Sequence, residues 1–179
     1  MKPKLNEMLM AGLSRFNTDL VVAHVGSDQE LFNDLVDIML TTNDSITLRA
    51  AWAISVITDK EPWLFEPRIY EVFDKRNSFK HPSIARFLLR YMAHVELREE
   101  KLGEIFDFSY NALNNTNNPP AIRVYAMQVL FNIAMKEPDL INELILVIES
   151  HLDTGSAGLI NRGEKLIKKL KAKQKQMLS

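Results

Sequence analysis

An internal repeat of 37 residues constrains the fold of this sequence more than any other feature. Arg49, Arg86 and Arg123 follow one another at intervals of 37 residues, and Arg162 comes 39 residues later. Apolar residues recur three and seven positions after each of the first three arginines, which is the spacing of one face of an α-helix. Those apolar residues are Trp52 and Val56, Leu89 and Ala93, and Ala126 and Leu130. Self-similarity at a period of this length indicates a chain built from repeated structural units.

Each repeat is predicted to hold two antiparallel helices. A helix-start signal stands just before each of the first three arginines, because Pro suits the first helical turn and Asp or Asn can cap its free amides. A second apolar series lies seventeen positions before the four arginines, each member within its own run of helical period. The start signals are Asp44–Ser45, His81–Pro82 and Asn118–Pro119, and the second series is Phe32, Ile69, Phe106 and Ile145.

The sequence therefore predicts an all-α fold, an α–α superhelix of about ten helices in a single domain over residues 1–179. A lone helix pair cannot hide its apolar face from water, so the pairs must stack on one another. The alternative is an irregular helical bundle whose arginines align by chance. Helices are expected near 3–14, 18–26, 28–41, 44–58, 64–76, 82–97, 100–115, 119–136, 138–151 and 156–173. They group into N-terminal capping helices at 1–27 and helical-pair repeats at 28–61, 62–98, 99–137 and 138–175.

Composition excludes several classes of protein. No cysteine occurs, which removes disulfides, thiolate nucleophiles and zinc sites with sulfur ligands. The N-terminal residues lack the continuous apolar core of a signal peptide, and no stretch approaches the roughly 18 apolar residues of a membrane span. The hydrophobic fraction of 46% and the charged fraction of 25% are typical of a globular domain. We therefore expect a cytoplasmic protein that makes no membrane contact.

The repeated segments resemble the HEAT repeat family, whose second helix carries an apolar-Arg step followed by small and apolar residues. The segments that carry the resemblance are LRAAWAISVI at 48–57 and IRVYAMQVLFNIA at 122–134, and the likeness covers roughly residues 28–172. This resemblance implies a stack of helix pairs that binds a protein or peptide partner and does not catalyse a reaction.

Two further segments, YAMQVL at 125–130 and RGEKLIKKL at 162–170, are similar to short bacterial helical-repeat proteins that are sometimes labelled adenylosuccinate lyase. The lyase family has a catalytic loop of the SSxMPxKxNP type, and this chain has no counterpart of that loop. We therefore regard the lyase label as a transfer error and do not extend it to this chain.

No motif that carries chemistry occurs in the sequence. The GxSxG, P-loop, GxGxxG and HExxH patterns are all absent, so we expect no catalytic residue, no metal and no cofactor. The histidines stand alone, without a second ligand at helical spacing, at His24, His81, His94 and His151. The acids of the first helices are interpreted as solvated stripes, and they include Asp34, Asp37, Glu71, Asp74, Glu104 and Asp107.

The candidate partner-binding residues are Arg49, Arg86, Arg123, Arg162 and Trp63. Two interpretations of the arginines stay open. Each guanidinium could pair with a carboxylate or a helix C-terminus of a neighbouring helix and so hold the stack together. The series could instead form a ladder of donors for an acidic peptide or a phosphate. Trp63 lies at a predicted helix start, where we expect it to be exposed.

Charge is distributed unevenly along the chain. Residues 162–179 carry a net charge of about +6, so the remainder is near −7 in a chain of net charge −1. The lysines suit either a terminal capping helix or contact with an anion. A protein or peptide partner is expected and nucleic acid is not, because DNA binding needs a broad cationic surface. The alternative is a nucleic-acid-binding protein similar to the alkylpurine DNA glycosylases, which are also built from HEAT-like helices.

Overall fold

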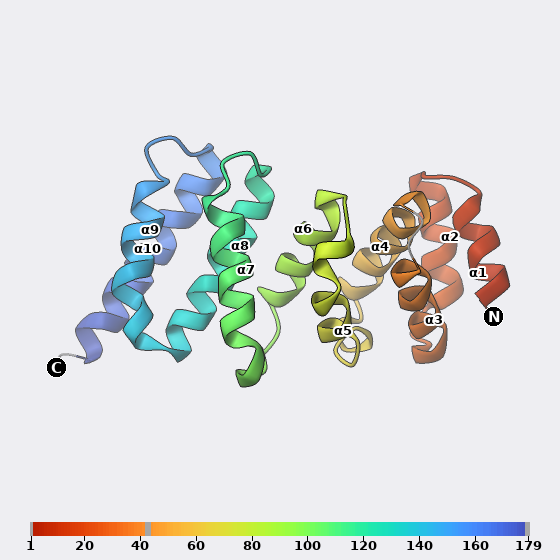
Figure 1. The fold of residues 1–179 in the computed structure, drawn as a ribbon, viewed down its shortest axis with the longest axis horizontal. Coiled ribbons are helices and arrows are strands. Elements are labelled where there is room, and N and C mark those ends of the chain that lie inside the picture. Colours follow the sequence, from red (N-terminus) through yellow and green to blue (C-terminus); the bar gives the residue numbers. More distant parts are fainter. Residues whose placement is uncertain (1, 42–43, 178–179) are drawn as a thin grey trace. The chain divides into compact units, whose positions relative to one another are not determined.

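The computed structural model describes residues 2–41 and 44–177, and no strand occurs in this part of the chain (Figure 1). Its α-helices are α1 (Lys2–Met10), α2 (Arg15–Val25), α3 (Gln29–Leu40), α4 (Asp44–Thr58), α5 (Ile69–Asp74), α6 (Pro82–Met92), α7 (Leu102–Asn114), α8 (Pro120–Lys136), α9 (Ile141–Ser150) and α10 (Ala157–Met177). Short 3-10 helices occur at Pro62–Leu64, Arg76–Ser78, Glu99–Lys101 and Pro138–Leu140.

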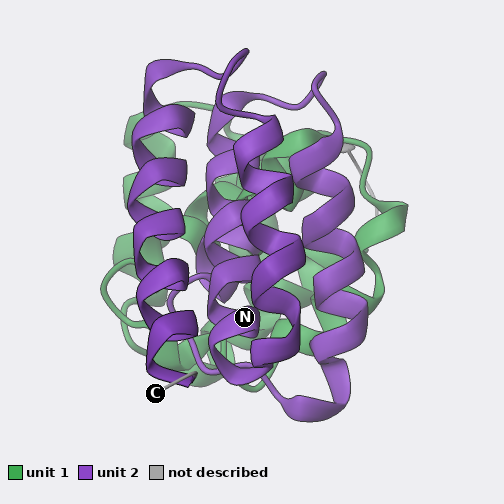
Figure 2. Ribbon diagram, turned by 90° about the vertical axis from the view of Figure 1, so that its left-hand side faces the viewer, with its two compact units in different colours: residues 1–88 green, residues 89–179 purple. Residues whose placement is uncertain are grey.

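The chain divides into two compact units, which Figure 2 shows in different colours. The N-terminal unit spans residues 1–88 and the C-terminal unit spans residues 89–179, so the division falls within α6.

Helix pairs stack on one another within the N-terminal unit. α3 pairs with α4, α1 packs on α3, and α2 packs on α4, so first helices contact first helices and second helices contact second helices. The core between them contains the fully buried Leu5, Phe32, Leu35 and Ile54. This pair-on-pair contact is the arrangement that the repeat predicts.

The C-terminal unit also consists of stacked helix pairs. α7 pairs with α8, α9 pairs with α10, and the second helices α8 and α10 pack together. Leu113, Met127, Leu130, Ile148 and Leu170 are completely buried in its core. The predicted all-α helical-repeat fold is confirmed, and the irregular bundle is not what the described residues form.

Several helices differ from the prediction at their ends. The helix expected over 3–14 ends at Met10, and Gly12 beyond it has a φ of 129°, which an α-helix does not contain. The helix expected over 64–76 is reduced to α5, because Pro67 has no N–H and restricts the backbone of the residue before it. α6 ends at Met92 instead of near residue 97. Just after this end, the Asn132 side chain donates a hydrogen bond to the Ala93 carbonyl at 2.9 Å. α10 continues to Met177, and Lys171 and Gln174 hold it to α9 through bonds to Glu149 and Asn142.

The predicted caps are borne out in part. The ring Nδ1 of His81 accepts the backbone N–H of Ser83 at 3.2 Å, so His81 caps α6 as the start signal predicts. Asn118 instead donates to the Ala112 carbonyl near the end of α7 at 2.9 Å. The side chain of Asp44 lies outside the part of the chain that the structure describes.

Candidate binding surfaces

The two repeat arginines of the N-terminal unit have different environments. Arg49, on α4, donates from Nη1 to the carbonyl of Leu9 at 2.8 Å, in the last turn of α1. A cation at a helix C-terminus satisfies a free carbonyl and interacts favourably with the helix dipole. Arg86, on α6, is exposed and makes no hydrogen bond or ion pair with any described residue.

Arg123, on α8, is buried in the C-terminal unit with 7% of its surface exposed. Its Nε donates to the Leu113 carbonyl at 2.9 Å, and its Nη2 lies 3.1 Å from Nδ1 of His151. On the other side of the ring, His151 Nε2 lies 2.9 Å from Oδ1 of Asn114. Arg123 therefore joins the end of α7 to the turn that follows α9.

The neighbours of His151 determine its protonation state. A guanidinium can only donate, so Nδ1 of His151 must accept, and the ring proton lies on Nε2, where it is donated to Asn114. Burial, with a smaller contribution from the positive charge of Arg123, lowers the pKa of His151 below its ordinary value. The buried group is therefore a neutral imidazole beside one cation, and it has no carboxylate partner among the described residues.

Arg162, on α10, is half-buried and donates from Nη2 to Oε1 of Gln128 on α8. Gln128 donates in turn to Asn132 at 2.7 Å, and Asn132 donates to the Ala93 carbonyl at 2.9 Å. The Nε of Arg162 is buried without a partner in the described chain. This series of hydrogen bonds joins α10 to α8, and it joins α8 to the turn after α6. One guanidinium and two neutral amide side chains form it.

Trp63 lies in the short 3-10 helix Pro62–Leu64 and is 49% exposed. Its indole Nε1 donates to Oε2 of Glu61 at 2.7 Å, which holds the ring against the turn while one face meets solvent. The exposure expected from its position before α5 is found. Of the five predicted contact residues, Arg86 and Trp63 are thus the exposed ones, and both belong to the N-terminal unit.

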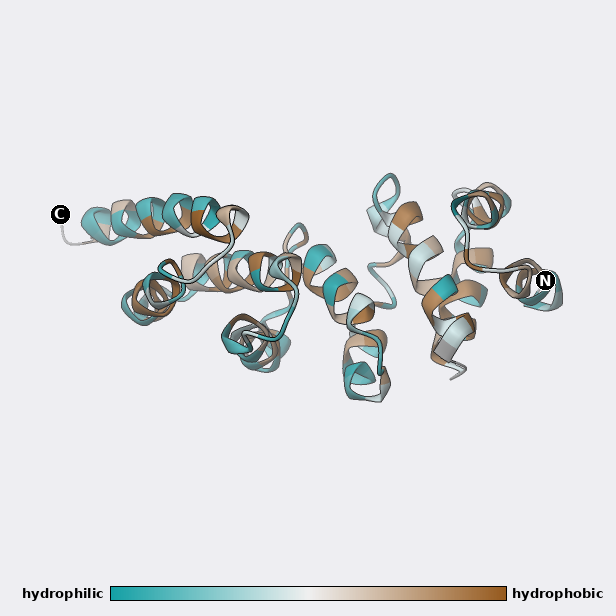
Figure 3. Cartoon of the chain, turned by 90° about the horizontal axis from the view of Figure 1, so that it is seen from above, coloured by the Kyte–Doolittle hydropathy of each residue, from teal (hydrophilic) through white to brown (hydrophobic). Residues whose placement is uncertain are grey.

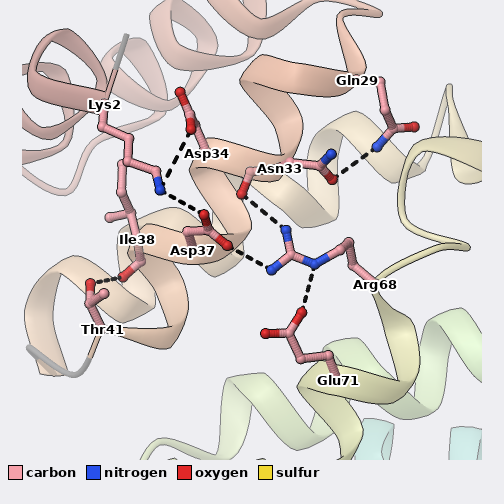
Figure 4. A network of polar contacts seen from close by, with 9 residues as sticks. All are labelled: Lys2, Gln29, Asn33, Asp34, Asp37, Ile38, Thr41, Arg68 and Glu71. Carbon is pink, nitrogen blue, oxygen red and sulfur yellow. Dashed lines mark hydrogen bonds and ion pairs between the residues drawn. The ribbon is translucent and has the colours of Figure 1, made fainter.

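A network of ion pairs joins α1, α3 and the start of α5 in the N-terminal unit (Figure 4). Lys2 Nζ and Arg68 Nη2 each lie 2.7 Å from a different carboxylate oxygen of Asp37. Arg68 also bonds Glu71 at 2.7 Å, and Lys2 lies 3.8 Å from Asp34. The hydrogen bond from Lys2, helped by Arg68, holds the pKa of Asp37 below its ordinary value against the opposing effect of burial.

The sequence reading missed this network. It placed Asp34, Asp37 and Glu71 on solvated stripes, whereas Asp34 and Asp37 are half-buried and bind cations from other helices. Arg68 lies outside the 37-residue arginine series. Its separation of 31 residues from Asp37 does not match the repeat either, so no periodic signal in the sequence pointed to this pair.

Apolar side chains face solvent along one side of α2. Phe16, Leu20 and Ala23 are exposed and stand at i, i+4 and i+7, which places them in one row on the helix surface. Phe16 is 71% exposed and Leu20 is 47% exposed. We call these three residues the α2 apolar stripe. The opposite side of α2 carries the buried Thr18, Val21 and Val25 and packs on α1 and α4.

The described residues contain no group of three His, Asp or Glu side chains that could hold a metal ion. No described helix is long and apolar enough to cross a membrane.

Comparison with known proteins identifies the family. A family model for the HEAT repeat domain matches residues 5–170. Neither a search of curated proteins nor a search of solved structures found a match. The matched range covers α2 to α9 whole, most of α1 and much of α10, and so includes both units. This chain belongs to the HEAT repeat family.

Proposed function

We propose that this HEAT repeat domain is a non-catalytic scaffold that binds a protein partner, and that the α2 apolar stripe is a point of contact. The observation that carries the proposal is the exposure of Phe16 and Leu20 on a helix whose other side is buried. Exposed aromatic and aliphatic side chains gathered on one face are typical of protein–protein interaction sites.

The surroundings of the stripe support a protein partner. Leu13, three residues before Phe16, is 52% exposed, and Arg15 and Asp19 form an ion pair beside the stripe at 2.9 Å. An apolar centre with a polar border is the usual composition of a protein interface. The stripe itself contains no cation that would attract a phosphate backbone.

Arg86 and Trp63 are proposed as further contact residues of the same unit. Arg86 can offer its five N–H donors without breaking a bond to another described residue. Trp63 presents a rigid ring at small entropic cost, which makes tryptophan frequent among residues that dominate binding energy. Arg49, Arg123 and Arg162 bind within the chain, so we assign them to the packing of the repeats.

Site-specific photo-cross-linking tests the proposal. Phe16 is replaced with a photoreactive phenylalanine in the full chain, and Asp107, an exposed residue of α7 outside the proposed surfaces, is replaced in a matched control. Irradiation in extract of the source cells should attach a polypeptide at position 16 and not at position 107. A second substitution, Leu20→Asp, should abolish the product while the circular dichroism spectrum stays unchanged.

The outcomes separate the competing functions. Absence of a cross-linked polypeptide at position 16, or a product that Leu20→Asp does not affect, would overturn the proposal for α2. Attachment of nucleic acid would favour the glycosylase-like alternative, and titration of the chain with labelled DNA at low and moderate salt would then measure that affinity.

A further inference from the structure

A groove of about 600 Å³ lies between α9 and α10 in the C-terminal unit. We call it the α9–α10 groove. It is lined by the apolar residues Leu152, Ile167 and Ala172, by Lys168, Lys171 and Lys175, and by Glu149 and Glu164. All of these residues belong to one unit, and none of them contributes to the α2 apolar stripe.

Close contact between the two helices builds one end of the groove. Gly163 of α10 is buried against α9, and a Cβ atom at this position would lie 2.7 Å from the Leu152 side chain and 3.0 Å from that of Ile148. Two polar bonds fix the helices along the groove. Lys171 pairs with Glu149 at 2.8 Å, and Gln174 donates to Asn142. The groove is therefore held in shape before any ligand arrives.

Two of the lysines that line the groove lack a partner in the described part of the chain. Lys168 and Lys175 line the groove and form no hydrogen bond or ion pair with any described residue, whereas Lys171 uses its charge on Glu149. Residues 168, 171 and 175 lie on one face of the helix. Like charges at this spacing destabilise a helix by tenths of a kcal/mol, so an anionic ligand here would relieve repulsion as well as gain ion pairs. Figure 3 colours most of α10 as hydrophilic.

The apolar lining of the groove is Leu152, Ile167 and Ala172, and α9 carries an exposed leucine near it. Leu146 is 68% exposed and lies between Asn142 and Glu149, at i+4 from the first and i−3 from the second, so the three share one face of α9. Asn142 and Glu149 both bond to α10, so Leu146 lies on the side of α9 that carries these bonds, next to the residues that line the groove but not one of them. This exposed leucine offers a further contact for an apolar side chain.

We propose that the α9–α10 groove binds an acidic amphipathic helix of a partner protein. Apolar side chains of that helix, at i, i+3, i+4 and i+7, would pack over Leu146, Leu152 and Ile167. Its carboxylates would pair with Lys168 and Lys175 on the border of the groove. This inference adds a second surface to the proposed function and does not depend on α2.

The carboxylates of the groove argue for a peptide over nucleic acid. Glu149 and Glu164 line the groove, and they would repel a continuous phosphate backbone. A peptide helix can alternate its charges and place an apolar row over the apolar lining. The apolar residues Leu166 and Leu170 of α10 are buried in the protein, so they are not available to enter a lipid bilayer.

Fluorescence anisotropy with a labelled synthetic peptide tests the inference on the full chain. The peptide carries leucines at i, i+3, i+4 and i+7, with alternating glutamates and glutamines elsewhere, and a scrambled peptide of the same composition is its control. We expect the ordered peptide to bind and the scrambled peptide to bind at least about tenfold more weakly, because only the ordered one presents an apolar row.

Two double variants with equal charge change locate the site. Lys168→Glu with Lys175→Glu should weaken peptide binding at least about tenfold, whereas Lys165→Glu with Lys173→Glu, outside the groove, should change it less than about threefold. Leu146→Asp should also weaken binding about tenfold. Urea unfolding checks that each variant remains folded.

Each other result overturns the inference. Equal losses in the two charge-matched variants would indicate a general attraction to lysine. Tighter binding of labelled DNA, or of phosphatidylserine vesicles, than of the ordered peptide would assign the lysines to phosphate. Retention of full affinity by Leu146→Asp would show that the bound helix does not pack against α9, contrary to the proposed placement. Sedimentation showing that the chain binds a second copy instead of the peptide would assign the groove to self-association.

Discussion

Each of the two units of this HEAT repeat domain is stabilised internally by its own kind of polar contact. In the N-terminal unit, Asp37 of α3 binds Lys2 and Arg68 from two other segments through partly exposed ion pairs. In the C-terminal unit, the buried Arg123 binds a carbonyl and a neutral imidazole. Ion pairs of the C-terminal unit, such as Lys136–Glu96 and Lys171–Glu149, lie at more exposed positions.

The comparison shows that one repeated residue need not play one role. The arginine series keeps its spacing, but Arg49 binds a helix end, Arg86 meets solvent, and Arg123 is buried. The repeat pattern reports which helix face an arginine occupies. The partner that the arginine finds depends on the side chains that the neighbouring helices place there.

The largest expected effect is that of Arg123→Ala. The substitution leaves the Leu113 carbonyl and Nδ1 of His151 buried without a donor, so we expect a loss of about 2–4 kcal/mol in the free energy of unfolding. Arg86→Ala is the matched control and should change it by less than about 0.5 kcal/mol. Urea denaturation measures both, and equal losses would show that Arg123 is no more structural than the exposed arginine.

Gly163→Ala tests how closely the helices approach in the C-terminal unit. The added Cβ would collide with Leu152 and Ile148, so we expect a loss of about 1–3 kcal/mol. Gly158→Ala, on the same helix with no atom within 4 Å of the new Cβ, should be neutral or stabilising by less than about 1 kcal/mol. Thermal unfolding distinguishes the two. Similar melting temperatures would mean that α9 and α10 are not in tight contact.

Arg68→Ala tests the ionic network of the N-terminal unit. Asp37 and Glu71 lose a shared cation, and because these pairs are partly exposed we expect a loss of about 1 kcal/mol at low salt. High salt should reduce that loss, since it screens the pairs in the unsubstituted chain. The loss in Arg123→Ala should not depend on salt. Urea unfolding curves of both variants at two salt concentrations measure these losses. Equal salt dependence of the two losses would contradict the contrast between an ionic N-terminal unit and a neutral C-terminal one.

The smallest of the expected stability changes is the dependence on pH that His151 contributes. Its pKa is lower in the folded state than in the unfolded chain, so the unfolded chain binds more protons and stability falls as the pH drops below about 6.5. His151→Gln should flatten the pH profile in this range, whereas His94→Gln, at an exposed position, should leave it unchanged. An identical profile in both variants would show that His151 does not couple to folding.

The fold could be predicted from the sequence because helix starts and apolar periodicity are local signals. Pro82 and Pro119 mark helix starts, and α6 and α8 begin there within one residue. Pro67 is a further local signal, and it could have predicted that α5 begins only at Ile69. The early end of α6 was not predictable, because it involves a bond from Asn132, 39 residues away.

The candidate site was less predictable for the same reason. Whether an arginine is buried, like Arg123, or exposed, like Arg86, depends on what the next helix pair places beside it. The residues next to Arg123 in the sequence do not predict its contact with His151, which lies 28 residues further along the chain. The exposure of Phe16 is equally a tertiary property, since an isolated period of 3.6 cannot distinguish a covered face from an uncovered one.

Native-state hydrogen exchange on the unsubstituted chain tests the contrast between the units most directly. We predict that high salt at neutral pH weakens amide protection in α3 and α5 and leaves α7 and α8 unchanged. Lowering the pH from about 7.5 to about 5.5, with intrinsic exchange rates corrected, should weaken protection in α7 and α8 and not in α3 and α5, because His151 becomes protonated on unfolding while Asp37 stays ionised. Equal responses of both units to each treatment would contradict the account.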